Sequence, residues 1–181
     1  MNMKKLFIVL FIMSGLTRVV FSQQDVELQW HSMSEAMELN KTTPKKFLID
    51  VYTDWCGWCK VMDKNTFQHK QIAKIIDIYF YAVKFNAEKD ADLIYKNQTY
   101  KLMVDPNTKK GYHEFTSVLM NNQSSGYPTI CYMDQELNII QAISGYQTPE
   151  QIEPILKFFG TESYRTTDWQ TFTNAFKTEL K

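Results

Sequence analysis

Residues 45–62 read KKFLIDVYTDWCGWCKVM, and two cysteines lie where this stretch changes character. Residues 45–52 hold a short unbroken apolar run of the kind that a strand covered on both faces requires. From Cys56 onward the apolar residues follow helical spacing, with an interruption around Asn65 and Thr66. The sequence therefore predicts a buried strand that leads directly into a helix, with Cys56 and Cys59 at the junction.

The position of the two cysteines favours redox chemistry. A cysteine at the start of a helix lies among unpaired backbone N–H groups and at the positive end of the helix dipole, and both favour the thiolate. CxxC motifs lower the pKa of a cysteine from about 8.5 to between about 3.5 and 7.5. Cys56 is therefore the expected nucleophile. Cys59, one helical turn later, is the expected resolving thiol that attacks the mixed disulfide.

A metal site and a purely structural disulfide have less support. A zinc site would need two further ligands, and there is no second CxxC motif. The remaining candidate ligands are isolated in the sequence: His31, His69, His113 and Cys131. A structural disulfide across a two-residue gap would restrain the unfolded chain very little. We expect no metal and no cofactor beyond a redox-active disulfide, and we interpret Cys131 as an inert buried thiol.

Length, composition and charge limit the other function classes. With 181 residues, 44% of them apolar and 14% aromatic, the chain can form one domain plus extensions. Twenty acidic and twenty basic side chains cancel, so no broad basic face is expected. Nucleic acid is therefore not an expected partner.

Residues 1–22 are typical of a secretory signal peptide. Two lysines precede an apolar run from Leu6 to Leu16, and Val20 and Ser22 occupy the small-residue positions of a cleavage site. The run is shorter than the ~20 residues that cross a bilayer, so a retained membrane anchor is the weaker alternative. We expect a mature protein that begins near Gln23 and is periplasmic or secreted.

The first half of the remaining sequence predicts further elements. A helix capped by Ser32 should end before Pro44, with four apolar residues inward: Met33, Ala36, Met37 and Leu39. Residues 79–88 favour a strand and residues 91–97 a helix. Residues 99–111 suggest a small hairpin or ordered excursion, before a helix over about 112–121.

The second half predicts a hairpin and two helices. Residues 128–134 and 137–144 favour an antiparallel hairpin. A helix capped by Thr148 and Gln151, with Pro149 at its first position, should end at Gly160. A last helix is predicted after a second capping box, Thr167 and Gln170. Its apolar stripe is expected to dock on the chain's own domain, and it consists of Trp169, Phe172, Phe176 and Leu180.

Two motifs resemble the thioredoxin superfamily. IDVYTDWCGWCK at 49–60 is similar to the family's active-site strand and turn, and GYPT at 126–129 is similar to its cis-proline loop. The resemblance covers roughly residues 30–160. It implies an α/β thioredoxin fold, a central mixed sheet with flanking helices. The signal peptide, the WCGWCK form and the aromatic tail resemble those of exported thioredoxin-like proteins of Gram-negative bacteria.

This resemblance also implies a domain organisation. A signal peptide (1–22) would precede a thioredoxin-like domain (23–160) and a C-terminal amphipathic helix extension (161–181). The 41 residues between Asn86 and Pro128 exceed what a minimal thioredoxin uses, so an insertion is expected at about 96–111, before the cis-proline strand.

The resemblance assigns a proton-transfer role to Asp50. Asp50 matches the buried acid that accepts the proton of the resolving cysteine, and Lys84 matches the lysine that partners this acid. Burial in an apolar strand would raise the pKa of Asp50 toward working pH. An Asp that meets water at the end of its strand, and an ordinary strand-edge lysine, are the alternatives.

The resemblance also assigns a substrate-binding surface. A cis peptide before Pro128 would expose the backbone of Tyr127, so that an extended substrate segment can pair with it. Trp55 and Trp58 would flank the nucleophile as contact surface, unless both are packing residues. Gly145 would leave the substrate groove open, although a turn would equally well require a glycine there.

Together these features predict an exported thiol–disulfide oxidoreductase. Its partners would be protein dithiols and disulfides, and we favour the reductase direction, which requires an electron donor in the membrane. A disulfide oxidase or isomerase is the nearest alternative, and a redox-inactive binding module is the alternative from another class. The sequence makes no prediction about oligomeric state.

Overall fold

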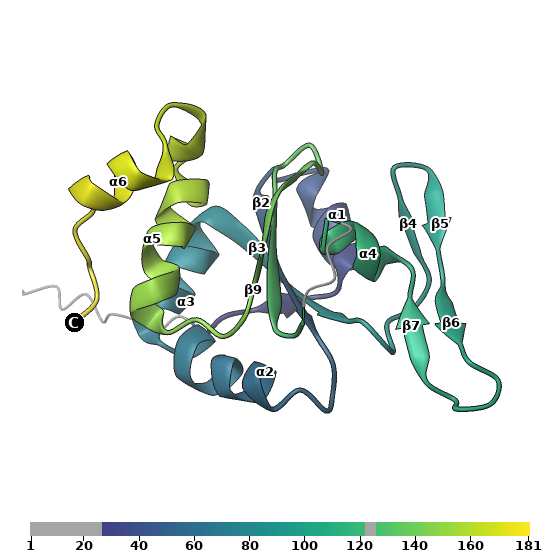
Figure 1. Ribbon diagram of the computed structural model, residues 1–181. Coiled ribbons are helices and arrows are strands. Elements are labelled where there is room, and N and C mark those ends of the chain that lie inside the picture. The colour runs from purple at the N-terminus through teal and green to yellow at the C-terminus, as the bar shows by residue number, and fades with distance from the viewer. Residues whose placement is uncertain (1–26, 122–125) are drawn as a thin grey trace, which may run out of the picture.

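The computed structural model describes residues 27–121 and 126–181, so the predicted signal peptide at 1–22 lies outside the described residues. Five strands form a mixed sheet (Figure 1). Their spatial order is β1 (Trp30–His31), β3 (Phe80–Asn86), β2 (Lys46–Tyr52), β8 (Thr129–Met133) and β9 (Ile139–Ser144). β1 and β2 run parallel to β3, whereas β8 is antiparallel to both β2 and β9. The predicted thioredoxin fold is confirmed.

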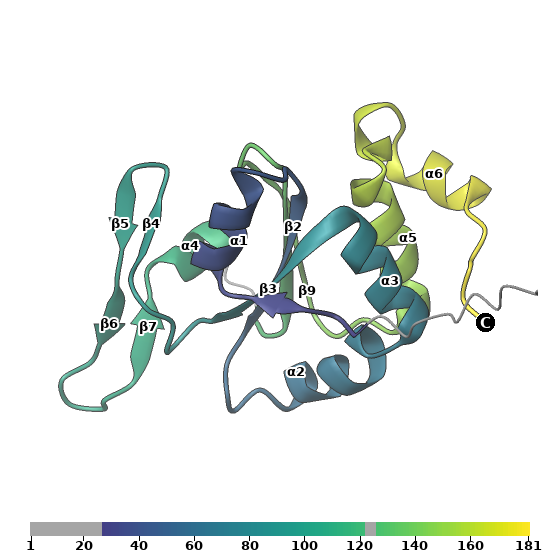
Figure 2. The same cartoon turned by 180° about the vertical axis from the view of Figure 1, so that it is seen from behind.

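Helices cover both faces of this sheet (Figures 1 and 2). One face packs against α1 (Met33–Asn40) and α4 (Phe115–Leu119). The other packs against α2 (Gly57–Met62), α3 (Lys70–Tyr79) and α5 (Pro149–Gly160). β2 lies in the middle of the sheet and is buried on both faces. Phe47, Ile49 and Val51 face α1, and Leu48 faces α2 and α3.

The chain changes helix type just after the cysteines. α2 leads into a π-helical stretch, η1 (Asp63–Phe67), and α3 starts after His69. The interruption predicted around Asn65 and Thr66 is this π-helical stretch. Thr66 and Phe67 are buried there, and the Thr66 hydroxyl donates a 2.6 Å hydrogen bond to the carbonyl of Gln147.

Two of the three caps predicted for helices agree with the structure. The cap predicted at Ser32 and the capping box predicted at Thr148 are confirmed, and Ser32 also forms a box with Glu35. The box predicted at Thr167 is wrong. Asp168 caps α6 (Trp169–Ala175), because its carboxylate accepts the backbone N–H of Thr171 at 2.9 Å and Asp is as good a cap as Thr. A short 3-10 helix, η2 (Ser163–Arg165), precedes α6, and Phe176 and Leu180 lie beyond its end.

The helix predicted over residues 91–97 is also wrong. These residues belong to a hairpin of β4 (Leu93–Tyr95) and β5 (Gln98–Tyr100), with Lys96 and Asn97 in the left-handed conformation at its turn. Leu93 and Tyr95 are buried while Ile94 is 67% exposed, which is the two-residue period of a strand.

A second hairpin, β6 (Leu102–Val104) and β7 (Gly111–His113), follows in the region where the insertion at about 96–111 is predicted. Residues 112 and 113 are therefore strand, and the helix predicted from residue 112 begins only at Phe115. Leu39, predicted to point inward, is 41% exposed near the end of α1. None of the helices within residues 27–121 and 126–181 has the length and apolar character needed to cross a membrane.

Candidate active site

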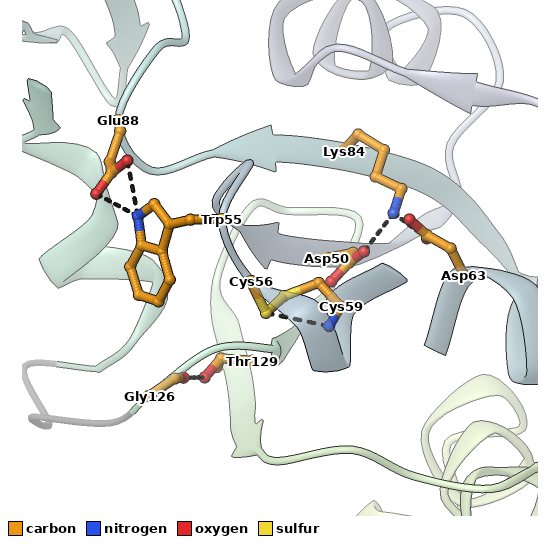
Figure 3. The surroundings of a disulfide bond; sticks show 9 residues. All are labelled: Asp50, Trp55, Cys56, Cys59, Asp63, Lys84, Glu88, Gly126 and Thr129. Atoms are coloured by element: carbon orange, nitrogen blue, oxygen red, sulfur yellow. Dashed lines mark hydrogen bonds and ion pairs between the residues drawn. A yellow bond between two sulfur atoms is a disulfide. The ribbon is translucent and has the colours of Figure 1, made fainter. Parts of the chain in front are cut away.

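The two cysteines lie at the N-terminus of α2 and form a disulfide (Figure 3). Cys56 is the N-cap residue, and its Sγ accepts the backbone N–H of Cys59 at 3.0 Å. The carbonyl of Thr53, just after β2, accepts the N–H of Cys56 at 3.1 Å, which ties the turn to the central strand. Both cysteines are almost fully buried, at 4% and 2% exposure. A partner sulfur that reacts with either cysteine must therefore come close to the residues that surround the disulfide.

Asp50 is buried in β2, as predicted. Its neighbours in the sheet are Lys84 of β3 and Ile130 of β8, and only 1% of the residue is exposed. The two-residue period of the strand places Asp50 on the same face as Leu48, the face covered by α2. Lys84 Nζ donates to Asp50 Oδ2 at 2.6 Å, whereas Asp50 Oδ1 is buried without a hydrogen-bond partner among the described residues.

These surroundings bring the pKa of Asp50 into the working range of a proton acceptor. Burial raises this pKa from 3.8 to about 6, although the charge and hydrogen bond of Lys84 lower it in part. A carboxyl with such a pKa can accept a proton near neutral pH and release it again.

Asp63 also belongs to this ionic group, although the sequence motifs did not include it. Its Oδ1 accepts a hydrogen bond from Lys84, so one ammonium serves two carboxylates (Figure 3). Burial by itself would lower the pKa of Lys84, but the two carboxylates outweigh it and raise this pKa. Asp63 lies one helical turn after Cys59, and this four-residue spacing was the signal that could have revealed it.

Aromatic rings hold the Lys84 ammonium in place. Its Nζ lies 4.6 Å from the ring centre of Trp30, 5.1 Å from that of Tyr52 and 5.6 Å from that of Phe67. This packing keeps Lys84 largely buried, so that its charge acts on Asp50 with little screening by water.

Two cavities lie beside this group, and Asp63 lines both of them. Cys59 and Asp63 line the same cavity of about 350 Å³, and Asp63 and Lys84 line a second one of about 630 Å³. Asp63 therefore lies beside both Cys59 and the Lys84 ammonium that binds Asp50.

The two tryptophans of the motif are exposed rather than packed in the core. Trp55 is 68% exposed and Trp58 is 62% exposed. Trp55 Nε1 donates to both carboxylate oxygens of Glu88 at 3.0 Å (Figure 3). The ring centre of Trp55 lies 5.9 Å from that of Tyr127. The ring centre of Trp58 lies 5.4 Å from that of Tyr146. Both indoles are therefore available as contact surface, and each has one aromatic neighbour.

The loop before β8 lies beside the cysteine turn through this contact of Trp55 with Tyr127. The peptide bond between Tyr127 and Pro128 is cis. Gly145 donates its N–H to the carbonyl of Pro128 at 2.8 Å and has φ +101°, a conformation that favours glycine. Apart from its chain neighbours, no described residue has an atom within 4 Å of the place where a Cβ of Gly145 would stand.

Cys131 lies apart from this site. It is fully buried in β8, on the face that packs against α1 and α4, and burial raises the pKa of its thiol to about 12. Such a thiol carries almost no thiolate near neutral pH. No three His, Cys, Asp or Glu side chains come together as a candidate metal site within the described ranges.

Solved structures of known proteins share this fold. A DsbH oxidoreductase is 16% identical with a TM-score of 0.52, covering 80% of this chain and 93% of its own. A thioredoxin-fold protein from Helicobacter pylori is 19% identical with a TM-score of 0.53, covering 83% and 86%. A thioredoxin from Thermus thermophilus is 11% identical with a TM-score of 0.52, covering 72% and 85%.

Sequence comparison gives one short match and one broad match. An uncharacterized protein of Caenorhabditis elegans is 32% identical over 71 residues, which are 38% of this chain and only 10% of that protein. The family model described as a thioredoxin-like domain matches residues 33–160, from the first residue of α1 to the last residue of α5. Because this match includes β2, both cysteines and the loop of Pro128, the chain belongs to the thioredoxin-like domain family.

Proposed function

We propose that this protein is an exported thiol–disulfide oxidoreductase that reduces disulfides of protein substrates through Cys56 and Cys59. The observation that carries the proposal is the Cys56–Cys59 disulfide at the start of α2, on the sheet face where the buried Asp50 has a pKa of about 6. A redox-inactive binding module has no need for an ionisable carboxyl in this position.

The reaction begins with the dithiol form. The Cys56 thiolate attacks one sulfur of the substrate disulfide, and the other substrate sulfur leaves as a thiolate. Cys59 then gives its proton to the Asp50 carboxylate and attacks the Sγ of Cys56. The second substrate sulfur leaves as a thiolate and the Cys56–Cys59 disulfide forms, so two electrons have passed to the substrate.

Lys84 and Asp63 adjust the pKa of Asp50 for this proton transfer. The Lys84 ammonium favours the carboxylate form that can accept the proton, while burial and the charge of Asp63 keep its pKa from falling to that of an exposed Asp. Neither residue needs to touch the sulfur atoms for this role.

In this proposal the loops around Cys56 bind the substrate. The backbone of Tyr127, before Pro128, would pair with an extended substrate segment, which gives affinity without demanding one sequence. The exposed faces of Trp55 and Trp58 would cover the flanking residues of that segment. The space that the described residues leave beside Gly145 gives room for it.

The reduction potential decides the direction of the reaction. We favour the reductase because no histidine lies between the cysteines to stabilise the thiolate and because Asp50 promotes resolution. A reductase in an oxidising compartment needs electrons from a donor in the membrane. Equilibration of the purified mature protein with glutathione buffers, followed by alkylation and mass measurement, gives the potential. A value near about −270 mV supports the reductase, whereas about −120 to −180 mV would indicate an oxidase or isomerase.

Trapping tests the exchange reaction itself. Cys59→Ser should accumulate covalent complexes with substrate proteins through Cys56, because the resolving thiol is missing. Cys131→Ser should leave the trapping by Cys59→Ser unchanged, and the further change Cys56→Ser should abolish it. Absence of any complex from an extract of exported proteins would contradict the proposal.

A further inference from the structure

More than half of the exposed large apolar side chains in the described part of the chain lie on two segments. Nine large hydrophobic side chains are exposed in the described part of the chain, and five belong to the cysteine turn or to the β6–β7 hairpin. These five are Trp55, Trp58, Met103, Val104 and Tyr112. Solvent-exposed groups of apolar side chains are typical of binding surfaces.

Met103 and Tyr112 form one side of the hairpin. They are directly opposite each other in the β6–β7 register, so their side chains share a face. They are 52% and 48% exposed, whereas His113, the next residue along β7, is fully buried on the other face. We call the pair of Met103 and Tyr112 the ribbon face.

Backbone contacts fix this hairpin against the active-site turn. A Cβ at Gly111 would stand 2.0 Å from the carbonyl oxygen of Glu88, and His113 donates its N–H to the carbonyl of Ala87 at 2.8 Å. Glu88 in turn holds the indole of Trp55. The ribbon face is thus attached, through a few direct contacts, to the residue that precedes Cys56.

The ribbon face is also a neighbour of the loop before β8. Burial raises the pKa of the Tyr127 phenol, and the nearby Glu88 carboxylate and Tyr112 phenol raise it further. Tyr127 contacts Trp55. Tyr112 therefore lies close enough to Tyr127 for the two phenols to interact electrostatically.

The chemistry of Cys56 determines what can cover this surface. Only 4% of Cys56 is exposed, so a partner chain that forms a mixed disulfide with Cys56 must lie against the surrounding protein surface. The β6–β7 hairpin lies at the end of the molecule where α2 begins, whereas the β4–β5 turn lies at the opposite end (Figures 1 and 2). A partner held at Cys56 therefore lies at the same end of the molecule as the β6–β7 hairpin.

We propose that Met103 and Tyr112 bind an apolar side chain of the protein substrate, a few residues away from its reactive cysteine, and so select substrates with such a residue. This inference rests on the proposed function and names the substrate class of the same site. The surface binds an extended segment, so it selects a local sequence and does not require a folded partner domain.

The test uses single-turnover reduction, which needs no electron donor. The dithiol protein is mixed with peptides whose one cysteine is bonded to 5-thio-2-nitrobenzoate. Cys56 attacks the peptide sulfur and releases the coloured thiolate, and Cys59 then releases the reduced peptide and closes the protein disulfide. A peptide series carries Phe or Ser at successive positions on either side of the cysteine. A small aromatic disulfide, 2,2′-dithiodipyridine, reports the reactivity of Cys56 alone.

The variant Met103→Thr/Tyr112→Thr removes the apolar face but keeps residues suited to strands. Ile94→Thr is the matched control, because Ile94 is 67% exposed in β4 of the same insertion. The wild type should react about five to ten times faster with the best Phe peptide than with its Ser counterpart, as expected for burial of one apolar side chain. The double variant should lose this preference and the control should keep it, with the rate toward the small disulfide unchanged in both.

Three outcomes would overturn the inference. If wild type and double variant prefer Phe peptides equally, the ribbon face does not bind substrate, although the proposed function stands. If the double variant instead converts a dimer into a monomer in sedimentation, with selectivity unchanged, the occupant is a second copy of the chain. If the wild type reacts with neither the peptides nor the small disulfide through Cys56, the proposed function fails and the inference fails with it.

Discussion

The carboxyl of Asp50 links stability to pH in this protein. Its pKa rises from 3.8 to about 6 on folding, so the folded state binds this proton more tightly than the unfolded state. The stability from this group is full below about pH 4 and is lost as the pH rises through about 6. At 1.36 kcal/mol per pKa unit, the loss amounts to about 3 kcal/mol.

Asp50→Asn should therefore stabilise the oxidised protein in a pH-dependent manner, because the amide stays neutral. The free energy of unfolding of the variant, relative to wild type, should increase by about 3 kcal/mol between pH 4 and pH 7. Denaturant unfolding at several pH values measures this difference. Asp54→Asn is the control, since Asp54 is exposed and the hydrogen bond from Lys89 holds its pKa below the ordinary value. A difference that does not vary with pH would show that Asp50 is not the buried titrating group.

Asp63→Asn should lower the pKa of Asp50 below about 6. The substitution removes a negative charge that raises this pKa, and it leaves the Lys84 ammonium to Asp50 alone. Both effects lower the pKa of Asp50. Carbon-13 NMR of the Asp50 carboxyl in the oxidised protein follows the titration directly, and Asp54→Asn again serves as the control. An unchanged midpoint would mean that Asp63 does not act on Asp50.

The β6–β7 hairpin depends on one close backbone approach. Gly111 leaves no room for a Cβ, because that atom would stand 2.0 Å from the carbonyl oxygen of Glu88. Gly111→Ala must therefore displace β7 or the chain around Glu88 and should cost about 2 kcal/mol of stability. Gly57→Ala is the matched control, since no described residue other than its chain neighbours has an atom within 4 Å of its Cβ position. Equal unfolding free energies for the two variants would contradict this close approach.

The two hairpins also illustrate how an element depends on its surroundings. Leu93 and Tyr95 pack in the same cluster as Phe115 of α4, and this burial selects a strand where the local residues also suit a helix. The insertion thus belongs to the core on one side while its other side faces solvent.

The C-terminal extension is attached to the rest of the molecule by both aromatic and ionic contacts. The ring centre of Phe158 in α5 lies 5.3 Å from that of Trp169 and 5.0 Å from that of Phe172. Further along, the fully buried carboxylate of Glu153 accepts the hydroxyl of Thr178 at 2.5 Å and the N–H of Glu179 at 2.7 Å. The tail beyond α6 therefore folds back onto α5.

Glu153→Ala should release this tail while the sheet stays folded. Hydrogen exchange at the amide of Glu179 should accelerate about tenfold or more, because a hydrogen bond to a charged group is lost. Exchange in β2 should not change. Glu150→Ala, on the exposed side of the same helix, should leave the Glu179 amide protected. Equal protection in both variants would show that Glu153 does not hold the tail.

Local patterns were sufficient for much of the fold. The apolar run of β2, the capping residues Ser32 and Thr148 and the two family motifs each act within a few residues, so the sequence alone predicted them. The same holds for burial of Asp50, which lies inside an apolar strand. The exposed indole of Trp58 also agrees with the contact role predicted for this residue between the two cysteines.

Contacts between distant segments were decided by the tertiary structure. Asp63 lies 21 residues from Lys84 in the chain and Lys84 lies 34 residues from Asp50, and no local pattern joins them. Trp55 and Glu88 are 33 residues apart, and Glu153 and Glu179 are 26 apart. The sheet brings these groups together because β2 and β3 pair in one register and α2 and α5 pack on one face. Periodicity and capping indicate only how a segment forms its own backbone hydrogen bonds and which of its faces is buried. The pKa of Asp50, the strands of the insertion and the docking of the tail depend instead on which other segments pack against that face.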